Sequence, residues 1–148
     1  AKGNLPNPWA LIHFLFMSLS FAIFAVSFIV GISFLLQRRA LKSRRPGWLS
    51  RWLPPLEVAD DVHAKASTLG FMVLSAGMLS GAILSKQISG VFFSGDLRQM
   101  AALLVWLVYA LFLNIRVRAG QRGRKGIMLS LLGFAVVILA YLAIRHRV

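Results

Sequence analysis

The stretch WALIHFLFMSLSFAIFAVSFIVGISFLL, residues 9–36, contains no Asp, Glu, Lys or Arg and decides the fold class. As an α-helix it would extend about 42 Å, more than the roughly 30 Å of a bilayer's hydrocarbon core. Backbone polar groups in lipid must be satisfied within the segment, and strand-like alternation is absent, so helices are predicted. With three further apolar stretches, the sequence predicts an all-α polytopic membrane protein with four transmembrane helices in a bundle. The expected spans of this single membrane domain, residues 1–148, are 9–36, 67–85, 98–116 and 126–144.

The composition agrees with this fold class. The 148 residues are 58% hydrophobic and only 14% charged, which is too little polar surface to coat a soluble domain of this size. The chain has no cysteine, which excludes disulfides, thiolate metal sites and cysteine catalysis. The expected surroundings are a lipid bilayer.

The basic residues predict the orientation. The connection between the first two spans holds seven of the 17 Lys and Arg residues, and the connection between the last two holds five. The positive-inside rule therefore places both connections in the cytoplasm and both termini on the outer, periplasmic side of a bacterial inner (plasma) membrane. This distribution explains the net charge of +13 without nucleic acid as a partner. An outer N-terminus also leads us to expect further chain upstream of residue 1.

A segment at residues 44–56 is expected to lie on the cytoplasmic membrane surface. Trp48 and Trp52 are four residues apart, so a short helical turn would place both indoles on one side, among arginines. Indole rings favour the headgroup zone and arginines favour phosphates. The alternative is a solvated loop.

Small and capping residues add two local predictions. Gly70, Gly77 and Gly81 share one helix face, which permits close approach of another helix within the bundle or, alternatively, of a second copy. Asp60 is expected to cap the start of the second membrane helix.

Few residues are suited to chemistry. No nucleophile motif, zinc-binding spacing or phosphate loop is present, so no catalytic residue is predicted, and the spans lack the mid-depth charges that a proton-coupled transporter needs. His13, one turn into the first span, is either a polar residue at the headgroups or a ligand for haem iron. His146 is either a polar residue that ends the last helix or a second ligand of the haem iron, on the same side of the membrane as His13.

The outer connection between the second and third spans reads ISGVFFSGDLRQ, residues 88–99. Phe92, Phe93 and Asp96 form a small amphipathic platform, suited either to a flat macrocycle or to anchoring a tight turn. Asp96 is also placed to cap the third span.

Several phrases resemble the cytochrome c assembly family, which includes CcsA, ResC, CcmC and HemX-like proteins. The matching phrases are TLGF at 68–71, SGAI at 80–83, VWLVYA at 105–110, GRK at 123–125 and LGF at 132–134. His13 after Trp9 resembles the outer histidine of that family. The loop keeps an acid at Asp96 but has Phe92 and Phe93 in place of the family's tryptophans, and Asn114 stands where many members have histidine. These changes resemble the HemX-like branch, of which the chain would be the C-terminal half.

The resemblance implies a membrane protein of haem handling and cytochrome c biogenesis. It implies haem as cofactor, with His13 as iron ligand and Phe92, Phe93 and Asp96 near the ring. His146 is added by the topology, because it falls on the same side of the membrane as His13. Other membrane proteins of cytochrome c assembly would be its partners. The alternative function is a non-catalytic membrane subunit or regulator, in tetrapyrrole metabolism or a larger membrane complex, that keeps the fold without binding haem.

Overall fold

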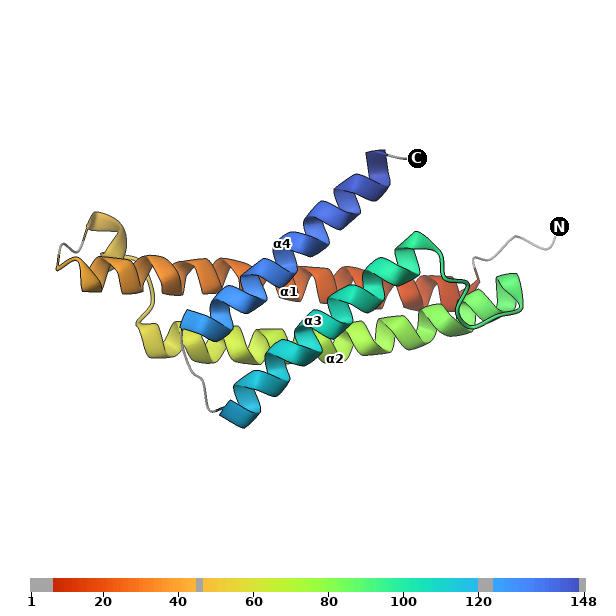
Figure 1. Cartoon of the computed structure of the whole chain (residues 1–148), viewed down its shortest axis with the longest axis horizontal. Helices are drawn as coiled ribbons and strands as arrows, with labels where there is room; N and C mark the ends of the chain where they lie inside the picture. The colour runs from red at the N-terminus through yellow and green to blue at the C-terminus, as the bar shows by residue number, and fades with distance from the viewer. Residues whose placement is uncertain (1–6, 45–46, 120–123, 147–148) are drawn as a thin grey trace.

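The computed structural model describes residues 7–44, 47–119 and 124–146. This part of the chain contains four α-helices, α1 (Pro8–Lys42), α2 (Leu56–Ser89), α3 (Leu97–Ala119) and α4 (Arg124–His146), and one short 3-10 helix, η1 (Trp48–Arg51). Successive α-helices alternate in direction (Figure 1), so the start of α1 and the end of α4 face the same way. The all-α prediction is confirmed.

Three helices of the described part are long and apolar enough to cross a membrane. They are α1, α2 and the segment Leu97–Arg118 of α3. The polytopic helical membrane protein predicted from the sequence is therefore confirmed. The expected fourth span, 126–144, lies within α4, and its crossing stays a prediction.

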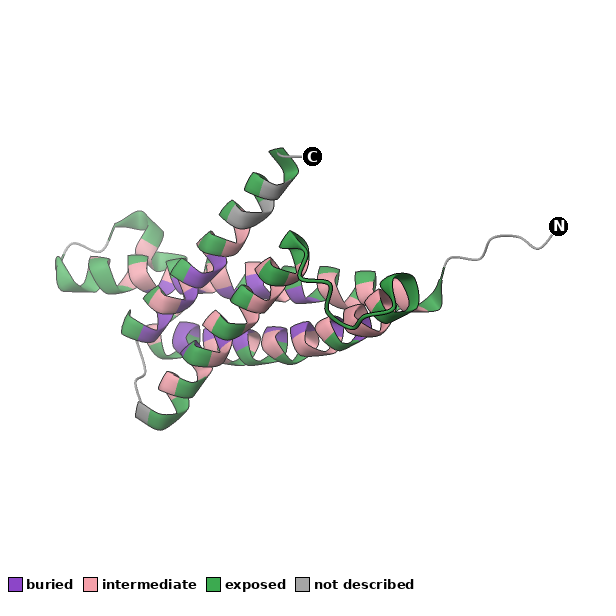
Figure 2. Cartoon of the chain, turned by 45° about the vertical axis from the view of Figure 1, so that its right-hand side comes forward, coloured by how far each residue is buried: buried purple, intermediate pink, exposed green. Residues whose placement is uncertain are grey.

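The outward faces of the helices are strongly apolar. Exposed residues lie along the outer sides and buried residues between the helices (Figure 2). Phe14, Leu79 and Leu139 are 65%, 69% and 66% exposed. A soluble protein would bury such a surface, whereas lipid chains solvate it without cost.

Local sequence explains most helix ends. Asn7 caps α1 by accepting a hydrogen bond from the Trp9 amide at 3.0 Å, and Pro8 supplies the fixed backbone angle of a first helical turn. Gly90 ends α2 with a left-handed φ of 77°, which costs a glycine little. The predicted cap at Asp60 is wrong: α2 begins at Leu56, directly after Pro55, so Asp60 lies inside the helix.

The antiparallel pair of α1 and α2 makes the most extensive helix contact in the described chain. Gly70, Gly77 and Gly81 all face α1, against Phe24, Met17 and His13 respectively. The intramolecular interpretation of this glycine face is therefore confirmed. Buried serines add hydrogen bonds along the same seam: Ser20 donates to the Gly70 carbonyl, and Ser27 and Ser67 lie 2.7 Å apart.

Aromatic side chains join α3 and α4 to this pair. The Phe24 ring stacks on Tyr109 with centroids 4.0 Å apart, and the Phe134 ring lies 5.0 Å from that of Phe28. Phe112 and Leu74 complete this core, to which every α-helix contributes. A smaller cluster, Phe34, Ala59 and Ile127, lies nearer the end of the bundle at which α2 begins.

The connection between α1 and α2 contains the short helical turn expected there. Trp48 begins η1 and Trp52 follows it, and these side chains are 76% and 81% exposed. The membrane-surface location of residues 44–56 stays a prediction. Below, the end of the bundle where α1 begins and α2 ends is called the His13 end, and the opposite end the Asp60 end.

Candidate functional site

His13 lies in the second turn of α1 and points into the seam with α2. Its Nδ1 lies 2.8 Å from the carbonyl oxygen of Gly77. Its ring is half-buried and lies over Gly81, which has no side chain to occupy that space. The ring therefore contacts protein backbone, whereas the alternative of a headgroup-facing histidine would direct it outward.

This contact decides which ring nitrogen carries the proton. A carbonyl oxygen only accepts hydrogen bonds, so Nδ1 must be the donor. In the neutral imidazole, Nε2 then has a free lone pair, and no hydrogen bond within the described residues engages it. Metal-ligating histidines in general hold their second nitrogen in this way.

The Phe92–Phe93–Asp96 loop lies at the same end of the bundle, between α2 and α3 (Figure 1). Phe92 and Phe93 are 54% and 53% exposed, and Lys86 lies over the Phe92 ring at 4.1 Å. Gln99 ties the loop to α2 by donating from Nε2 to the Ser85 hydroxyl at 3.2 Å. The aromatic pair is therefore accessible while its loop is anchored.

Asp96 caps α3, as the sequence indicated. Its Oδ1 accepts a hydrogen bond from the Gln99 amide at 2.8 Å, and Gln99 Oε1 accepts in return from the Ser94 amide at 2.8 Å. This arrangement differs from a capping box in that the Gln99 side chain accepts from the amides of Ser94 and Gly95, before the N-cap, and not from the amide of Asp96 itself. The contact of Asp96 with a cofactor stays a prediction.

His146 ends α4 and is exposed. Its helix slants away from α1 toward the C-terminus (Figure 1), and α4 packs on α1 through Phe134 and Leu131, in its N-terminal half. Among the described residues no hydrogen bond joins His146 to His13, so the two histidines lie toward the same end of the bundle without being paired in this structure.

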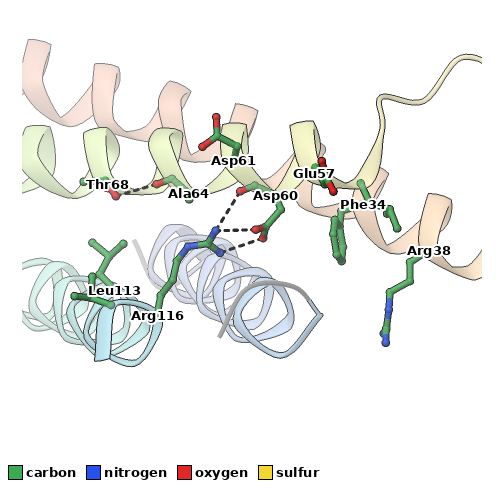
Figure 3. Close-up of a pocket in the computed structure, with 11 residues that line it drawn as sticks. Phe34, Arg38, Glu57, Asp60, Asp61, Ala64, Thr68, Leu113 and Arg116 are labelled. Carbon is green, nitrogen blue, oxygen red and sulfur yellow. Dashed lines mark hydrogen bonds and ion pairs between the residues drawn. The ribbon is translucent and has the colours of Figure 1, made fainter. Parts of the chain in front are cut away.

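A cavity lies at the Asp60 end of the bundle. It is a groove of about 750 Å³ between α2 and α3, with Phe34 and Arg38 of α1 among its lining residues (Figure 3). None of the five candidate residues lines it. Its lining is Phe34, Arg38, Leu56, Glu57, Asp60, Asp61, Ala64, Thr68, Leu113, Arg116 and Val117.

An ion pair that the sequence did not predict forms the floor of this groove. Arg116 of α3 reaches Asp60 of α2 with both terminal nitrogens, 3.2 and 3.0 Å from the two carboxylate oxygens (Figure 3). The side chains are only 13% and 12% exposed. The chain has only four acids against 17 basic residues, but the sequence does not say which of them is buried or which basic residue it pairs with.

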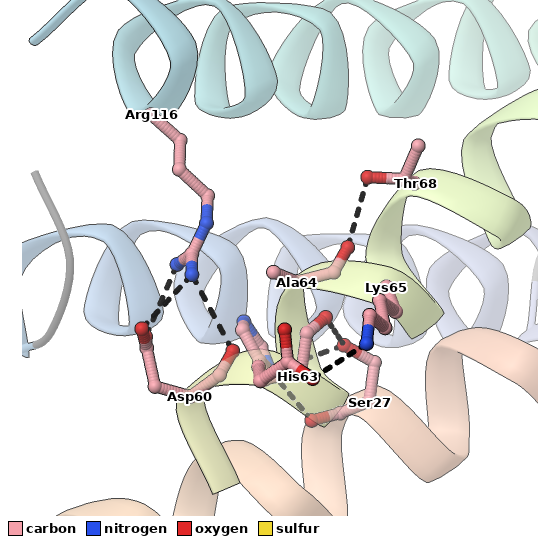
Figure 4. Close-up of polar contacts among 8 residues, drawn as sticks. Ser27, Asp60, His63, Ala64, Lys65, Thr68 and Arg116 are labelled. Carbon is pink, nitrogen blue, oxygen red and sulfur yellow. Dashed lines mark hydrogen bonds and ion pairs between the residues drawn. The ribbon is translucent and has the colours of Figure 1, made fainter. Parts of the chain in front are cut away.

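His63, one turn further along α2, is completely buried. Its Nδ1 lies 2.8 Å from the carbonyl oxygen of Ser27 on α1, beside the Ser27 hydroxyl (Figure 4). Its Nε2 has no partner, and its ring meets the edge of Phe112. The described residues contain no group of three His, Asp or Glu side chains that would hold a metal ion on their own.

Comparison with known proteins gives the family. The family model described as cytochrome C assembly protein matches residues 2–147. The cytochrome c biogenesis protein CcsA of Chlamydomonas reinhardtii is 30% identical over 140 residues, covering 95% of this chain and 38% of the relative. The protein of the same name from Prochlorococcus marinus strain NATL2A is 35% identical over 88 residues, covering 60% of this chain and 28% of the relative.

A third relative, CcsA of Prochlorococcus marinus strain MIT 9312, is 27% identical over 159 residues, with 95% of this chain and 52% of its own length covered. The chain thus spans about half or less of the length of these relatives. No solved structure matches. Because the family model covers nearly the whole sequence, the chain belongs to the cytochrome c assembly protein family.

Proposed function

We propose that this chain is the haem-handling part of a cytochrome c assembly protein, with haem bound at the His13 end. The observation that carries the proposal is the hydrogen bond from His13 Nδ1 to the Gly77 carbonyl, 2.8 Å long, which leaves Nε2 free as an iron ligand. Cytochromes c carry haem, and the relatives are named for cytochrome c biogenesis.

The residues at the His13 end of the bundle fit haem in part. His13 supplies the imidazole, and the exposed rings of Phe92 and Phe93 offer an apolar surface at the same end. Asp96 and His146 complete the predicted set, with His146 as the second ligand. Haem would supply the iron centre, and the chain's own residues would orient it and shield one face from water.

The proposed orientation places the His13 end outside and the Asp60 end in the cytoplasm of a bacterial inner membrane. It rests on the twelve basic residues of the two connections at the Asp60 end. A chain without native cysteine permits a clean test with Ser43→Cys and, as its mirror, Ser94→Cys. A membrane-impermeant maleimide added outside should label only Ser94→Cys. Labelling of Ser43→Cys alone would show that the orientation is the opposite of the proposed one.

The test of haem binding is a titration of the purified protein in lipid nanodiscs, followed by the Soret band. We expect the parent to shift the band, His13→Ala to lose the shift, and His13→Gly to regain it when free imidazole is added. His146→Ala should weaken binding by a smaller factor, because His13, which is held in place by the Gly77 carbonyl, remains, whereas His146 is exposed at the end of α4.

The same titration decides between the two functions that the sequence left open. The alternative is a non-catalytic membrane subunit or regulator that keeps the fold without binding haem. If the parent gives no Soret shift, or His13→Ala binds as the parent does, the proposal fails and this alternative replaces it.

A further inference from the structure

On the side of α2 that faces His13, the lack of a side chain at Gly81 leaves room for the imidazole ring. A Cβ atom added there would lie 2.8 Å from His13 Cε1 and 2.9 Å from Nδ1. Such distances are shorter than real Cβ contacts, so even alanine would displace the ring. The absence of a side chain at residue 81 is therefore what lets His13 reach the backbone of α2.

The hydrogen-bond acceptor lies one helical turn before this glycine. The Gly77 carbonyl accepts from His13 Nδ1 at 2.8 Å and also from the Ser80 hydroxyl at 2.8 Å. The carbonyl and the bare Cα of Gly81 thus define a seat, made of Gly77 and Gly81, that fixes both the position and the tautomer of the ring.

The bundle contains the same arrangement a second time, with the helices exchanged. His63 of α2 approaches the Ser27 carbonyl of α1 at 2.8 Å, and Gly31, again four residues later, lies under its ring (Figure 4 shows the hydrogen bond). A Cβ atom at Gly31 would lie 3.1 Å from His63 Nδ1. The pairing of a carbonyl with a glycine four residues on is thus a recurring way to hold an imidazole here.

The two copies differ in access. His63 is fully buried and its Nε2 is enclosed without a partner, whereas His13 is only half-buried. A ligand can therefore reach the imidazole at the His13 seat without opening the bundle, but not the one at His63.

We propose that Gly81 and the Gly77 carbonyl are positioning groups for His13, holding it in the Nδ1–H tautomer so that Nε2 is the ligating atom. The ligand itself rests on the proposed function, but the seat is testable without it. Loss of such supporting groups in metal sites costs about 10- to 100-fold in affinity. We expect a loss of that size in haem affinity for Gly81→Ala.

The matched control is Gly70→Ala, on the same face of the same helix. An added Cβ at Gly70 would lie 2.8 Å from Phe24 Cε1, as close as the one at Gly81 lies to His13. Both variants should therefore lower the melting temperature in nanodiscs by similar amounts. Only Gly81→Ala should change the imidazole, because Gly70 does not contact it.

The first measurement is the tautomer, by nitrogen-15 NMR of histidine-labelled protein without haem, with the His13 signals assigned by their loss in His13→Ala. The parent and Gly70→Ala should show a protonated Nδ1 and a bare Nε2, and Gly81→Ala should lose this signature. The proposal is overturned if the parent carries the His13 proton on Nε2, or if the His13 tautomer in Gly81→Ala is the same as in the parent.

The second measurement is haem affinity, with Gly81→Ala expected to bind about 10- to 100-fold more weakly than Gly70→Ala. Equal affinities of the two variants overturn the positioning role. If the parent binds no haem, the proposed function fails, while the NMR result still decides the seat.

Stability gives a check that does not need a ligand. Gly81→Ala should lower the melting temperature of the parent but not of His13→Ala, where the shortened side chain leaves room for the new methyl group. An equal loss in both backgrounds contradicts a contact between residues 13 and 81.

Discussion

The two ends of the α1/α2 seam hold a histidine in the same way but surround it differently. At the Asp60 end, His63 is enclosed by Ser27 and Phe112, beside the ion pair of Asp60 with Arg116. At the His13 end, the ring is half-buried, and an accessible aromatic loop lies at the same end of the bundle. The comparison indicates that polar groups hold helices together at the first end and are open to a ligand at the second.

The largest expected effect tests the structural role of the Asp60 end and comes from the ion pair between Asp60 and Arg116. Asp60→Ala would leave Arg116 with an uncompensated charge at a site where its side chain is 13% exposed. Removing one partner of a buried pair costs about 3 kcal/mol or more. We expect a loss of about 3 kcal/mol in the free energy of unfolding in mild detergent, with haem binding unchanged in the folded fraction.

Asp61→Ala is the control for this variant. Asp61 pairs with Lys65 at 2.7 Å, but those side chains are 59% and 77% exposed. Exposed pairs contribute at most about 1 kcal/mol, so this change should be nearly silent. Equal stability of the two variants would show that the ion pair of Asp60 with Arg116 does not stabilise the packing of α3 against α2.

The two histidines give the next largest effect and a direct contrast. His63→Ala removes a fully buried ring and its hydrogen bond to α1, and truncation of large buried side chains costs about 2 kcal/mol or more. His13→Ala should cost about 1 kcal/mol, because this ring is half-buried and its one interhelical hydrogen bond contributes modestly in a membrane. Unfolding measurements beside haem titrations check the contrast.

We expect the two effects to separate. His63→Ala should lower stability and keep haem affinity, whereas His13→Ala should keep most of the stability and lose haem. Loss of haem binding in a folded His63→Ala variant would contradict the division of roles between the two ends.

Much of the fold was readable from the sequence because lipid imposes a length and a composition on each span. The uncharged stretch 9–36 predicted α1, and Pro8 marks its start. The start of α2 was misplaced because Asp60 was taken as its cap, whereas the helix begins at Leu56, directly after Pro55, and continues through a charged turn before the apolar stretch. Hydropathy detects the segment of a helix that lies in lipid, but it does not show how far the helix continues outside the membrane.

The site was only partly readable, for a different reason. His13 and the Phe92–Phe93–Asp96 loop were predicted as candidates from residue type and order along the chain, and their role stays a prediction. The partners of His63 and Arg116 lie 36 and 56 positions away, on other helices, and no local pattern selects Ser27 or Asp60 among the available polar residues. The glycine face of α2 was recognised as a packing surface, but its fit to an imidazole depends on the register of α1 against α2.

The smallest expected effect concerns Asp96 at the His13 end. It separates the role of this side chain as a helix cap from an effect of its negative charge on the ligand. Asp96→Ala removes the acceptor of the Gln99 amide and should cost about 1 kcal/mol of unfolding free energy. Asp96→Asn retains a good capping group without the charge, so stability should stay within about 0.5 kcal/mol of the parent. If Asp96 only caps α3, Asp96→Asn binds haem as the parent does, whereas an altered affinity at unchanged stability shows that the carboxylate acts on the ligand itself.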